Sequence, residues 1–420
     1  MTTVIREKAG SDRLGDDEIF IALKSFLEKK KPRRLLILPP DYTRLYSGAG
    51  KITAFILDIL GDSCRTDIMP ALGTHVPMTE RECESFFMGR VRHDGLLVHR
   101  WREDVVKIGE VPADFVKDVS DGILDESIDV EVNRVIVSGN YDLILSIGQV
   151  VPHEVVGMAN YSKNIFVGCG GASMINSSHK LGAFYGMERI MGRDYSPVRR
   201  VFDYAEEHFL SELPLTYILT VATAENDETL IHGLYITDRR DGFTEAVADS
   251  QKRNLIHLDS PLRKVVVYLD PREFRSTWLG NKAIYRTRMA IADGGELIVL
   301  APGVERFGED PENDRLIRKY GYCGRENVLK LCREHSDLRA NMSVAAHLIH
   351  GSSDGRFGIT YCTKELGRGD IENVNFGYIP YDEAVKTYDP SVLRDGINTV
   401  NGEEIFYISN PALGLWTADL

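Results

Sequence analysis

Residues 34–44 read RLLILPPDYTR, and this stretch points to the fold class. The apolar run stops at Pro39 and Pro40, which predicts a short buried strand that runs into a loop. Helical spacing follows at 51–60, and a second short strand is predicted at 66–72. Strands that alternate with helical stretches favour parallel α/β layers.

The same alternation continues along the rest of the chain. Further strand-like runs lie at 132–138, 141–147, 164–167, 215–223, 264–269 and 296–301, and helical character lies at 281–292. The chain has 420 residues, of which 43% are hydrophobic. This length predicts two or three domains of roughly 100–200 residues each. The fold class is therefore expected to be α/β, with two α/β domains and a cleft between them.

A domain boundary is expected near residues 255–265. QKRN at 251–254 and DSP at 259–261 interrupt the apolar pattern there, and KVVVYL at 264–269 begins a second α/β unit. Ligands in open α/β sheets bind at the carboxyl ends of the strands. The loops before Asn281 and after Ala301 are therefore expected near one functional edge of the second sheet.

Composition and charge narrow the class of protein. The chain has 50 basic and 63 acidic residues, a net charge of −13, which argues against nucleic acid or an anionic membrane as the main partner. No apolar run approaches the ~18–20 residues that a membrane span needs, and residues 1–10 lack the apolar core of a signal peptide. The six scattered cysteines contain no CxxC pair, so neither a disulfide framework nor a zinc knuckle is expected. A cytoplasmic protein with neither a membrane nor a nucleic-acid partner is expected.

Asp41 and Arg44 stand directly after the first apolar run. One interpretation is a local ion pair that shapes the turn. The other is a binding site in which Arg44 holds a carboxylate, because the planar guanidinium fork matches a carboxylate bidentately. The residues alone leave both open.

Two histidines lie in loops that follow strand-like runs. His75 lies in GTHVPMTE at 73–80, and His153 lies in GQVVPHE at 148–154. A lone loop histidine is often an ordinary hydrogen-bonded surface residue. It also titrates near neutrality, so it is the default general base of an enzyme.

The segment KNIFVGCGGASMINSSHKLG at 163–182 holds several further candidates: Lys163, Gly168, Gly170, Gly171 and His179. Closely spaced glycines let backbone N–H groups approach a phosphate, or they form an ordinary tight turn. The three histidines could also be zinc ligands, although no HExxH or short His/Cys spacing supports that interpretation.

Taken together, the motifs resemble the nickel-dependent lactate racemase family of 2-hydroxyacid racemases and epimerases. The matching pieces are DYTR at 41–44, GTHVPMT at 73–79 and PHE at 152–154. Lys163 follows His153 by ten residues, and His179 follows Lys163 by sixteen, in keeping with the family's spacing. NKAIYRTRMAIADGGELIVLAPG at 281–303 is similar to the family's second-domain substrate segment.

The resemblance implies a nickel-pincer nucleotide, a pyridinium mononucleotide whose thio-acyl groups hold nickel. Lys163 matches the lysine that bonds covalently to this cofactor, and His179 matches the protein ligand that completes the nickel coordination. The glycines at 168, 170 and 171 are expected to help bind the cofactor. Cofactor-synthesis enzymes are implied as partners.

The resemblance also assigns the substrate contacts. His75 and His153 match the two acid/base histidines, Arg44 matches the arginine near the substrate carboxylate, and Asp41 is its acidic neighbour. Lys282 matches a substrate-contacting lysine from the second domain. Oxidation of C2 to a ketone avoids forming a carbanion beside a carboxylate. Two histidines, one for each orientation, would let both enantiomers react.

The sequence departs from the lactate enzymes just before Lys282. A Tyr-Gln pair of those enzymes is replaced by Trp278 and Leu279, so a small-molecule 2-hydroxy acid other than lactate is expected, with a preference for a sugar acid such as an aldonate. Trp278 either stacks on a larger substrate or belongs to the core. Arg286 and Arg288 could reach a second acidic group, but they are expected to be solvated helix residues.

The resulting domain prediction has two parts. Residues 1–260 and 396–420 form a cofactor-binding and catalytic domain, and residues 261–395 form a substrate-closing domain. Two alternatives remain open: a zinc-type metal hydrolase, and a non-catalytic protein that binds a hydroxy acid or the cofactor.

Overall fold

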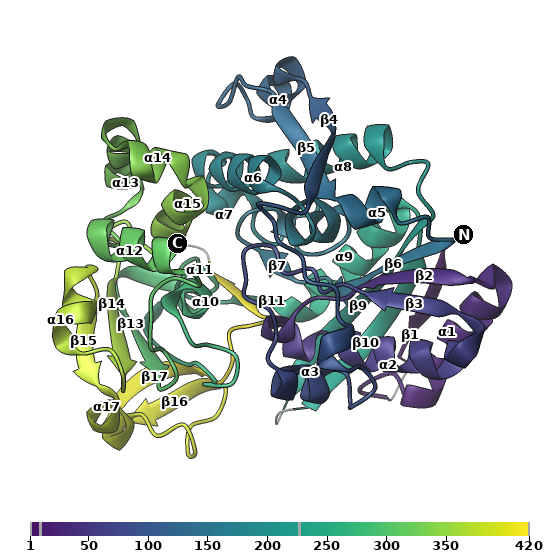
Figure 1. The fold of residues 1–420 in the computed structure, drawn as a ribbon. Helices are drawn as coiled ribbons and strands as arrows, with labels where there is room; N and C mark the ends of the chain where they lie inside the picture. Colours follow the sequence, from purple (N-terminus) through teal and green to yellow (C-terminus); the bar gives the residue numbers. More distant parts are fainter. Residues whose placement is uncertain (1, 8–10, 226–227, 419–420) are drawn as a thin grey trace. The chain divides into compact units, whose positions relative to one another are not determined.

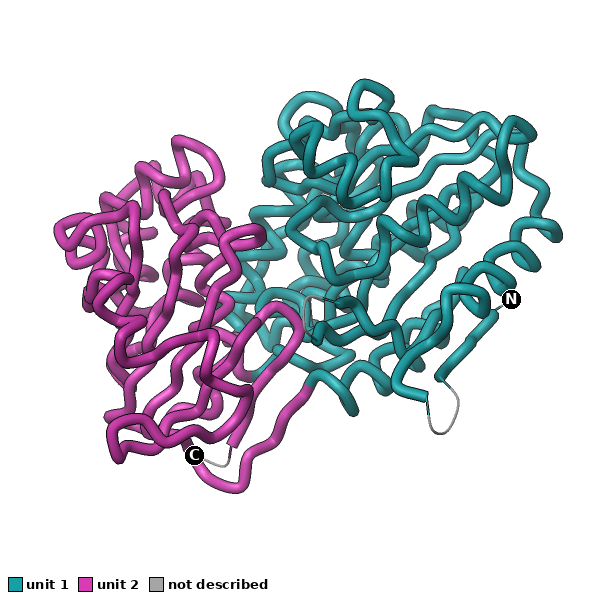
Figure 2. Tube along the Cα trace, turned by 90° about the horizontal axis from the view of Figure 1, so that it is seen from below, with its two compact units in different colours: residues 1–185, 189–254 teal, residues 186–188, 255–420 magenta. Residues whose placement is uncertain are grey.

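The computed structural model describes residues 2–7, 11–225 and 228–418. It divides into two compact units, which are drawn in different colours in Figure 2. Unit 1 comprises residues 1–185 and 189–254, and unit 2 comprises residues 186–188 and 255–420. Each unit is built on a mostly parallel sheet with helices packed on it (Figure 1), so the α/β class with more than one domain is confirmed.

The described part of unit 1 contains a six-stranded sheet in the order β1-β10-β9-β6-β2-β3. The strands are β1 (Thr3–Arg6), β2 (Arg34–Leu38), β3 (Arg65–Ile68), β6 (Leu143–Gln149), β9 (Leu215–Glu225) and β10 (Glu228–Thr237). β3, β2, β6 and β9 are parallel, while β10 and β1 are antiparallel to their neighbours. From β2 the chain adds β3 on one side and later β6 on the other, so the strand order reverses at β2. Open α/β sheets bind ligands at the carboxyl ends beside such a reversal.

The side chains of β2 show how this sheet is held between two layers. Leu35 and Ile37 belong to one core and Leu36 and Leu38 to the other, as the two-residue period of a strand requires. All four are fully buried, each worth roughly 1.5–3 kcal/mol. A continuous apolar run marks a strand that is covered on both faces.

The helices of unit 1 supply the two covering layers. α1 (Asp16–Lys30) and α2 (Ala49–Leu60) contribute to the first core, and α6 (Ala172–Tyr185), α8 (Pro197–Phe209) and α9 (Arg240–Asn254) contribute to the second. Shorter elements complete the unit: α3 (Glu80–Phe86), β4 (Val105–Val111), α4 (Ala113–Val119), β5 (Ile128–Asn133), α5 (Arg134–Ser138), β7 (Pro152–His153) and β8 (Gly157–Met158). α7 (Met187–Ile190) lies where the chain passes between the units.

The described part of unit 2 has its own six-stranded sheet, in the order β15-β14-β13-β12-β17-β16. The strands are β12 (Leu262–Tyr268), β13 (Ile291–Ala301), β14 (Gly358–Thr363), β15 (Gly377–Pro380), β16 (Gly396–Val400) and β17 (Glu403–Ile408). Only β16 runs antiparallel to its neighbour. The helices are α10 (Thr277–Gly280), α11 (Lys282–Tyr285), α12 (Pro311–Tyr320), α13 (Arg325–Glu334), α14 (Ser336–Ala340), α15 (Met342–His350), α16 (Arg368–Asn373) and α17 (Tyr381–Thr387). β11 (Leu255–Leu258) pairs with β18 (Leu415–Ala418).

The structure corrects the predicted path of the C-terminal segment. The boundary lies between Asn254 and Leu255, and residues 396–418 group with unit 2 rather than returning to the first domain. The reason is strand pairing, because β17 lies parallel to β12 in the centre of the second sheet and β16 pairs with β17. β18 likewise pairs with β11, the first strand of unit 2.

Three local predictions were also wrong. Residues 132–138 form the end of β5 and then α5, and residues 164–167 lie in a π-helical turn, Asn164–Gly168. The helix expected at 281–292 is only the single turn α11, after which the chain enters β13.

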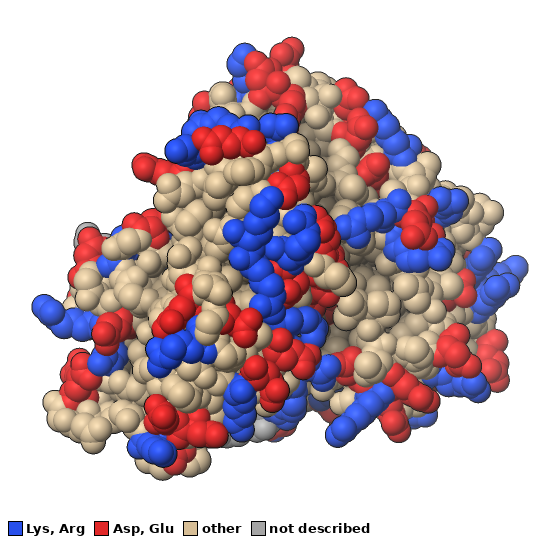
Figure 3. All heavy atoms as spheres, turned by 60° about the vertical axis from the view of Figure 1, so that its left-hand side comes forward, with Lys and Arg blue, Asp and Glu red and all other residues tan. Residues whose placement is uncertain are grey.

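Basic and acidic side chains are mixed on the face drawn in Figure 3. Many of them pair locally on the surface. Arg318, for example, lies 2.7 Å from both Asp314 and Asp370. Exposed pairs of this kind contribute little stability each.

Within the described ranges, no helix has both the length and the apolar character needed to cross a membrane.

Candidate active site

Three loops of unit 1 carry the sequence-predicted polar residues to one edge of the sheet. Asp41 follows β2, His75 follows β3, and His153 follows β6. Because these three strands are parallel, their carboxyl ends lie at the same edge, next to the reversal of strand order. The fold thus brings together groups that are more than a hundred residues apart in the chain.

Asp41 and His75 form a buried hydrogen-bonded pair. Nδ1 of His75 lies 2.7 Å from Oδ2 of Asp41, which is 4% exposed. Burial opposes ionisation of Asp41, but the charges of His75 and Arg44 and hydrogen bonds from His75 and Thr43 lower its pKa to about 2. An ionised carboxylate can only accept, so Nδ1 of His75 carries a proton and Nε2 is left to exchange one.

Local backbone geometry explains how this pair is built. Asp41 caps the 3-10 turn Tyr42–Ser47 and accepts from the backbone N–H of Thr43 at 2.9 Å. Gly73 has a φ of 57°, and its N–H donates to the carbonyl of Gly168 at 2.8 Å. A side chain at position 73 would be strained there, so glycine lets the turn before His75 pack against Gly168.

Arg44 joins this network through Thr43. Its Nη1 donates to Oγ1 of Thr43 at 2.8 Å and to the Thr43 carbonyl at 3.3 Å. Oγ1 of Thr43 in turn donates to Oδ1 of Asp41. The positive charge of Arg44 helps to lower the pKa of Asp41. The hydrogen bonds that connect the two side chains run through Thr43.

His153 is held in a different way. It is 8% exposed, and the backbone N–H of Val155 donates to its Nδ1 at 3.1 Å. The carboxylate of Glu154 lies 3.5 Å from the same nitrogen. Because Nδ1 accepts a hydrogen bond from Val155, a neutral His153 carries its proton on Nε2. His75 and His153 therefore present opposite tautomers, one suited to take a proton and one suited to give one.

Lys163 stands at the start of the π-helical turn Asn164–Gly168 and is partly buried. Burial and the charge of Arg44 lower the pKa of Lys163 to about 8, while Glu154 and Asp41 act in the opposite direction. A larger fraction of this amine is therefore neutral near neutral pH than for a surface lysine. A neutral amine is the nucleophilic form.

His179 lies on α6 with its ring fixed by the helix backbone. Its Nδ1 lies 2.6 Å from the carbonyl oxygen of Ile175, one turn earlier, to which it donates. Burial lowers the pKa of His179, and the charge of Lys163 acts in the same direction. A neutral ring whose Nδ1–H is engaged by a backbone carbonyl presents Nε2 as a lone pair, as in many metal-binding histidines.

Close packing explains why glycine stands at positions 168, 170 and 171. A Cβ on Gly168 would lie 2.7 Å from Cβ of Ala71, and one on Gly171 would lie 2.3 Å from a carboxylate oxygen of Glu131. That carboxylate also accepts from the backbone N–H of Ser173 at 2.9 Å. The first turn of α6 is thus already capped by an anion, which is unfavourable for a phosphate at this position. A Cβ on Gly170 would likewise meet the carbonyl of Phe166 at 1.8 Å.

The predicted residues of unit 2 lie in a buried network. Nζ of Lys282 is 3.2 Å from Oε1 of Glu273, with side-chain exposures of 7% and 3%. Trp278 stacks on His347 with ring centroids 4.5 Å apart, and Leu279 is buried. One face of Trp278 is therefore already occupied.

Arg286 and Arg288 are each 3% exposed, so the prediction of solvated side chains was wrong. Arg286 donates to the carbonyls of Ala412 and Gly414, and Arg288 donates to the carbonyl of Ser352 and to Asp354.

Sequence reasoning missed three residues that shape these sites. Thr43 and Glu154 lie inside the quoted motifs, so their neighbours already pointed to them. Glu273 lies nine residues before Lys282 in a segment with no recognisable pattern, and only the structure pairs the two. Across residues 2–7, 11–225 and 228–418, no group of three His, Cys, Asp or Glu side chains is arranged to hold a metal ion.

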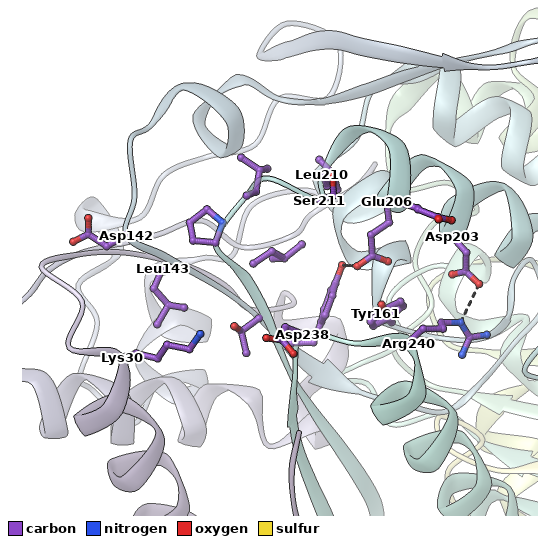
Figure 4. A pocket seen from close by; sticks show the side chains of 16 residues that line it. Lys30, Asp142, Leu143, Tyr161, Asp203, Glu206, Leu210, Ser211, Asp238 and Arg240 are labelled. Atoms are coloured by element: carbon purple, nitrogen blue, oxygen red, sulfur yellow. Dashed lines mark hydrogen bonds and ion pairs between the residues drawn. The ribbon is translucent and has the colours of Figure 1, made fainter. Parts of the chain in front are cut away.

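A separate pocket of about 580 Å³ lies at the amino ends of β6 and β9, the opposite edge of the sheet from His75 and His153. Figure 4 shows Tyr161, Asp203, Glu206 and Arg240 around it. The hydroxyl of Tyr217 donates to Glu206 at 2.8 Å, and burial raises the pKa of that carboxyl to about 7.

The fold and the site define an α/β protein with an Asp–His pair, a second histidine and a lysine of lowered pKa at the carboxyl edge of its first sheet. Residues 21–190 match the family model of the lactate racemase N-terminal domain. Those residues belong to that domain family, so the resemblance drawn from the motifs is confirmed. The family supports a racemase or related isomerase.

Solved structures extend the likeness of the fold to nearly the whole chain. A crystal structure of a Thermotoga maritima protein is 24% identical, with a TM-score of 0.83 over 97% of this chain and 99% of that one. The lactate racemase apoprotein from Thermoanaerobacterium thermosaccharolyticum is 15% identical, with a TM-score of 0.70 over 96% of this chain and 93% of that one. No curated protein sequence matches the chain.

Proposed function

We propose that this protein inverts C2 of a 2-hydroxy acid as a racemase or epimerase that uses a nickel-pincer nucleotide. The observation that carries the proposal is the mutual influence of the motif residues within unit 1. The charges of Arg44, Asp41 and Glu154 act on Lys163, Lys163 and Glu154 act on His179, and Asp41 bonds His75. That the charges of these residues act on one another supports the proposal that they serve one site.

The two histidines account for proton transfer. Nε2 of His75, left free to accept because Nδ1 donates to the Asp41 carboxylate, takes the proton of the C2 hydroxyl from one enantiomer. Nε2 of His153 gives a proton to the C2 oxygen when the product forms, and in the reverse direction the two exchange roles. Arg44 binds the substrate carboxylate, because its guanidinium fork matches two oxygens. We propose Trp278 and Lys282 as further substrate contacts.

Two side chains, those of Lys163 and His179, have the chemistry needed to hold this cofactor. When bound, the nickel-pincer nucleotide would supply the acceptor and donor of the C2 hydride. Lys163 would hold it covalently through an amine whose lowered pKa favours acylation. His179 would complete the nickel coordination through Nε2, since its Nδ1 is bound to Ile175. A metal that brings its other ligands within a cofactor needs only one from the protein.

A polar, larger substrate such as an aldonate is the favoured class. Trp278 and Leu279 replace a pair that includes a glutamine, so one hydrogen bond to a small hydroxy acid is lost. The cytoplasm is the proposed compartment, with cofactor-synthesis enzymes as partners.

A panel of 2-hydroxy acids tests the activity directly. Protein produced together with the cofactor-synthesis enzymes should epimerise at least one member at C2, and in deuterated water the recovered substrate should carry no solvent deuterium at C2, because the hydride returns intact. Bound zinc without any nucleotide would favour a hydrolase instead. Cofactor binding without inversion of any member would favour a non-catalytic binding protein.

A further inference from the structure

Arg199 on α8 is fully buried, and its guanidinium spans the loop that leads to Lys163. Nη1 donates to Oγ of Ser162 at 2.8 Å, and Nη2 donates to the carbonyls of Met158 at 2.7 Å and Asn160 at 3.1 Å. The planar fork of arginine can hold several acceptors at fixed angles, which a lysine cannot do. Arg199 thus ties this loop to the helix layer.

The loop itself is held in a conformation that side chains disfavour. Asn160 and Tyr161 have φ values of 67° and 56° and follow one another in the chain. Left-handed backbone conformations are unfavourable for residues other than glycine and persist where their surroundings hold them. Asparagine tolerates this region better than tyrosine does. The loop would therefore relax if its contacts were removed.

Aromatic contacts also fix the side chain of Tyr161. Its ring stacks on Phe243, with centroids 5.0 Å apart and an angle of 16°, and the Arg199 guanidinium lies 4.6 Å from the centroid of the same phenylalanine. Tyr161 also lines the pocket at the amino edge of the sheet (Figure 4). The side chain is thus packed on several sides while its backbone is strained.

The backbone on the other side of Lys163 is fixed as well. Nδ2 of Asn164 donates to the carbonyl of Leu38 at 3.1 Å and to Oγ of Ser146 at 2.9 Å, which anchors it to β2 and β6. Lys163 therefore stands between Ser162, held by Arg199, and Asn164, held by the sheet. The backbone that carries the Lys163 side chain is therefore fixed on both sides.

We propose that Arg199 is a positioning residue that directs the Lys163 amine into the candidate active site by holding residues 158–162, in which Asn160 and Tyr161 are left-handed, in place. This inference rests on the proposed function, in which Lys163 bonds to the cofactor. Arg199 itself touches neither the substrate nor the cofactor.

Chemical labelling of the cofactor-free full chain tests the inference. Acetic anhydride is applied at low extent, and mass spectrometry gives the ratio of acetylation at Lys163 to that at Lys252, whose side chain is 73% exposed. Arg199→Met should lower this ratio by about an order of magnitude, because a Lys163 amine released from its buried position regains a higher pKa and is neutral, and so nucleophilic, for a smaller fraction of the time. The matched control is Arg200→Met on the same helix, whose side chain is 49% exposed and which should leave the ratio unchanged.

Two further variants separate positioning from charge and from loss of fold. Arg199→Lys keeps the positive charge but loses the fork, so its ratio should stay low. Full recovery in Arg199→Lys would overturn the inference, since charge alone would then suffice. Ser162→Ala removes one acceptor only and should give an intermediate ratio, together with faster amide hydrogen exchange at residues 160–163. Unchanged labelling and exchange in a folded Ser162→Ala protein would also overturn the inference.

Measuring cofactor attachment to Lys163 tests the proposed function separately from the role of Arg199. If wild-type protein made with the cofactor-synthesis enzymes carries no adduct on Lys163, the proposed function fails, while the labelling ratios still decide the role of Arg199. If Arg199→Met carries as much adduct as wild type and labels like wild type, the inference fails and the proposed function stands.

Discussion

The Asp41 carboxylate lies 2.7 Å from Nδ1 of His75, so an ionised, buried acid fixes which nitrogen of the histidine carries the proton. The backbone N–H of Val155 imposes the opposite tautomer on His153. The two histidines thus differ before any substrate binds. One is prepared to accept a proton and the other to donate one.

Replacing Asp41 by asparagine should lower turnover strongly with little change in fold. The amide can donate to Nδ1 of His75 and thereby favour the wrong tautomer, an effect worth about 10⁴-fold in the Asp–His pair of a serine protease. We expect a fall of roughly 10²–10⁴-fold in the rate of C2 inversion at neutral pH. Asp58→Asn, at an exposed pair with Arg90, is the matched control and should turn over normally. Near-normal turnover in Asp41→Asn would show that this pair does not set the base.

The lowered pKa of Asp41 should also make the free energy of unfolding depend on pH in the acid range. The pKa of Asp41 is about 2 in the folded chain and near 3.8 in the unfolded chain, so its contribution is present above about pH 4 and is lost as the pH falls towards 2. The contribution is on the order of 2 kcal/mol. Denaturant unfolding of wild type and Asp41→Asn should therefore differ at pH 5 and converge near pH 2. A difference that does not change with pH would contradict this assignment.

The raised pKa of Glu206 should change stability with pH in the opposite direction, so that the folded state is less stable at high pH. Burial raises its pKa from 4.5 to about 7, so the folded state favours the protonated acid, and this stability is present below about pH 4.5 and lost as the pH rises through 7. Glu206→Gln keeps an acceptor for Tyr217 without the charge. It should raise the melting temperature at pH 8, by the equivalent of about 3 kcal/mol, and have little effect at pH 4. Equal effects at both pH values would rule out a raised pKa.

The buried ion pair of unit 2 should behave as a coupled unit. Removing Glu273 alone leaves Lys282 charged and buried, which costs about 3–5 kcal/mol. Glu273→Ala should therefore destabilise the chain more than the double change Glu273→Ala with Lys282→Met. A double-mutant cycle of unfolding free energies measures the coupling. Additive single effects would mean that the two side chains do not interact in solution.

Alanine variants of the three histidines should differ in how much nickel they retain. His75→Ala and His153→Ala should abolish inversion and keep nickel, because neither is proposed to touch the metal. His179→Ala should lower the affinity for nickel by at least about 10–100-fold, which is the loss seen when only an outer-shell partner of a metal ligand is removed. Loss of nickel from His75→Ala, or full turnover in either acid/base variant, would refute the assigned roles.

Contiguous stretches of sequence were enough to predict much of the fold and the positions of the site motifs in unit 1. The apolar run at 34–38 is a central strand covered on both faces, and DYTR, GTHVPMT and PHE lie at the carboxyl ends of β2, β3 and β6. These motifs are predictable because each strand end and its loop are contiguous in the chain.

The failures are non-local. Residues 164–167 are as apolar as a strand, yet Asn164 is bound to β2 and β6 and the segment winds into a π-helical turn. Residues 396–408 join the second sheet through pairing of β17 with β12, which are more than a hundred residues apart. Arg199 and Glu273 have no sequence signal, because their importance comes only from the partners that folding gives them.

The mass of the Lys163 peptide shows whether the cofactor is attached to this lysine. Full-length protein should be produced with and without the cofactor-synthesis enzymes, digested, and compared with a Lys163→Ala variant prepared in the same way. We expect Lys163 to carry the mass of the nickel-pincer nucleotide only when the synthesis enzymes are present, and the loaded protein to contain nickel. An unmodified Lys163 in loaded protein that nonetheless inverts a 2-hydroxy acid would contradict it.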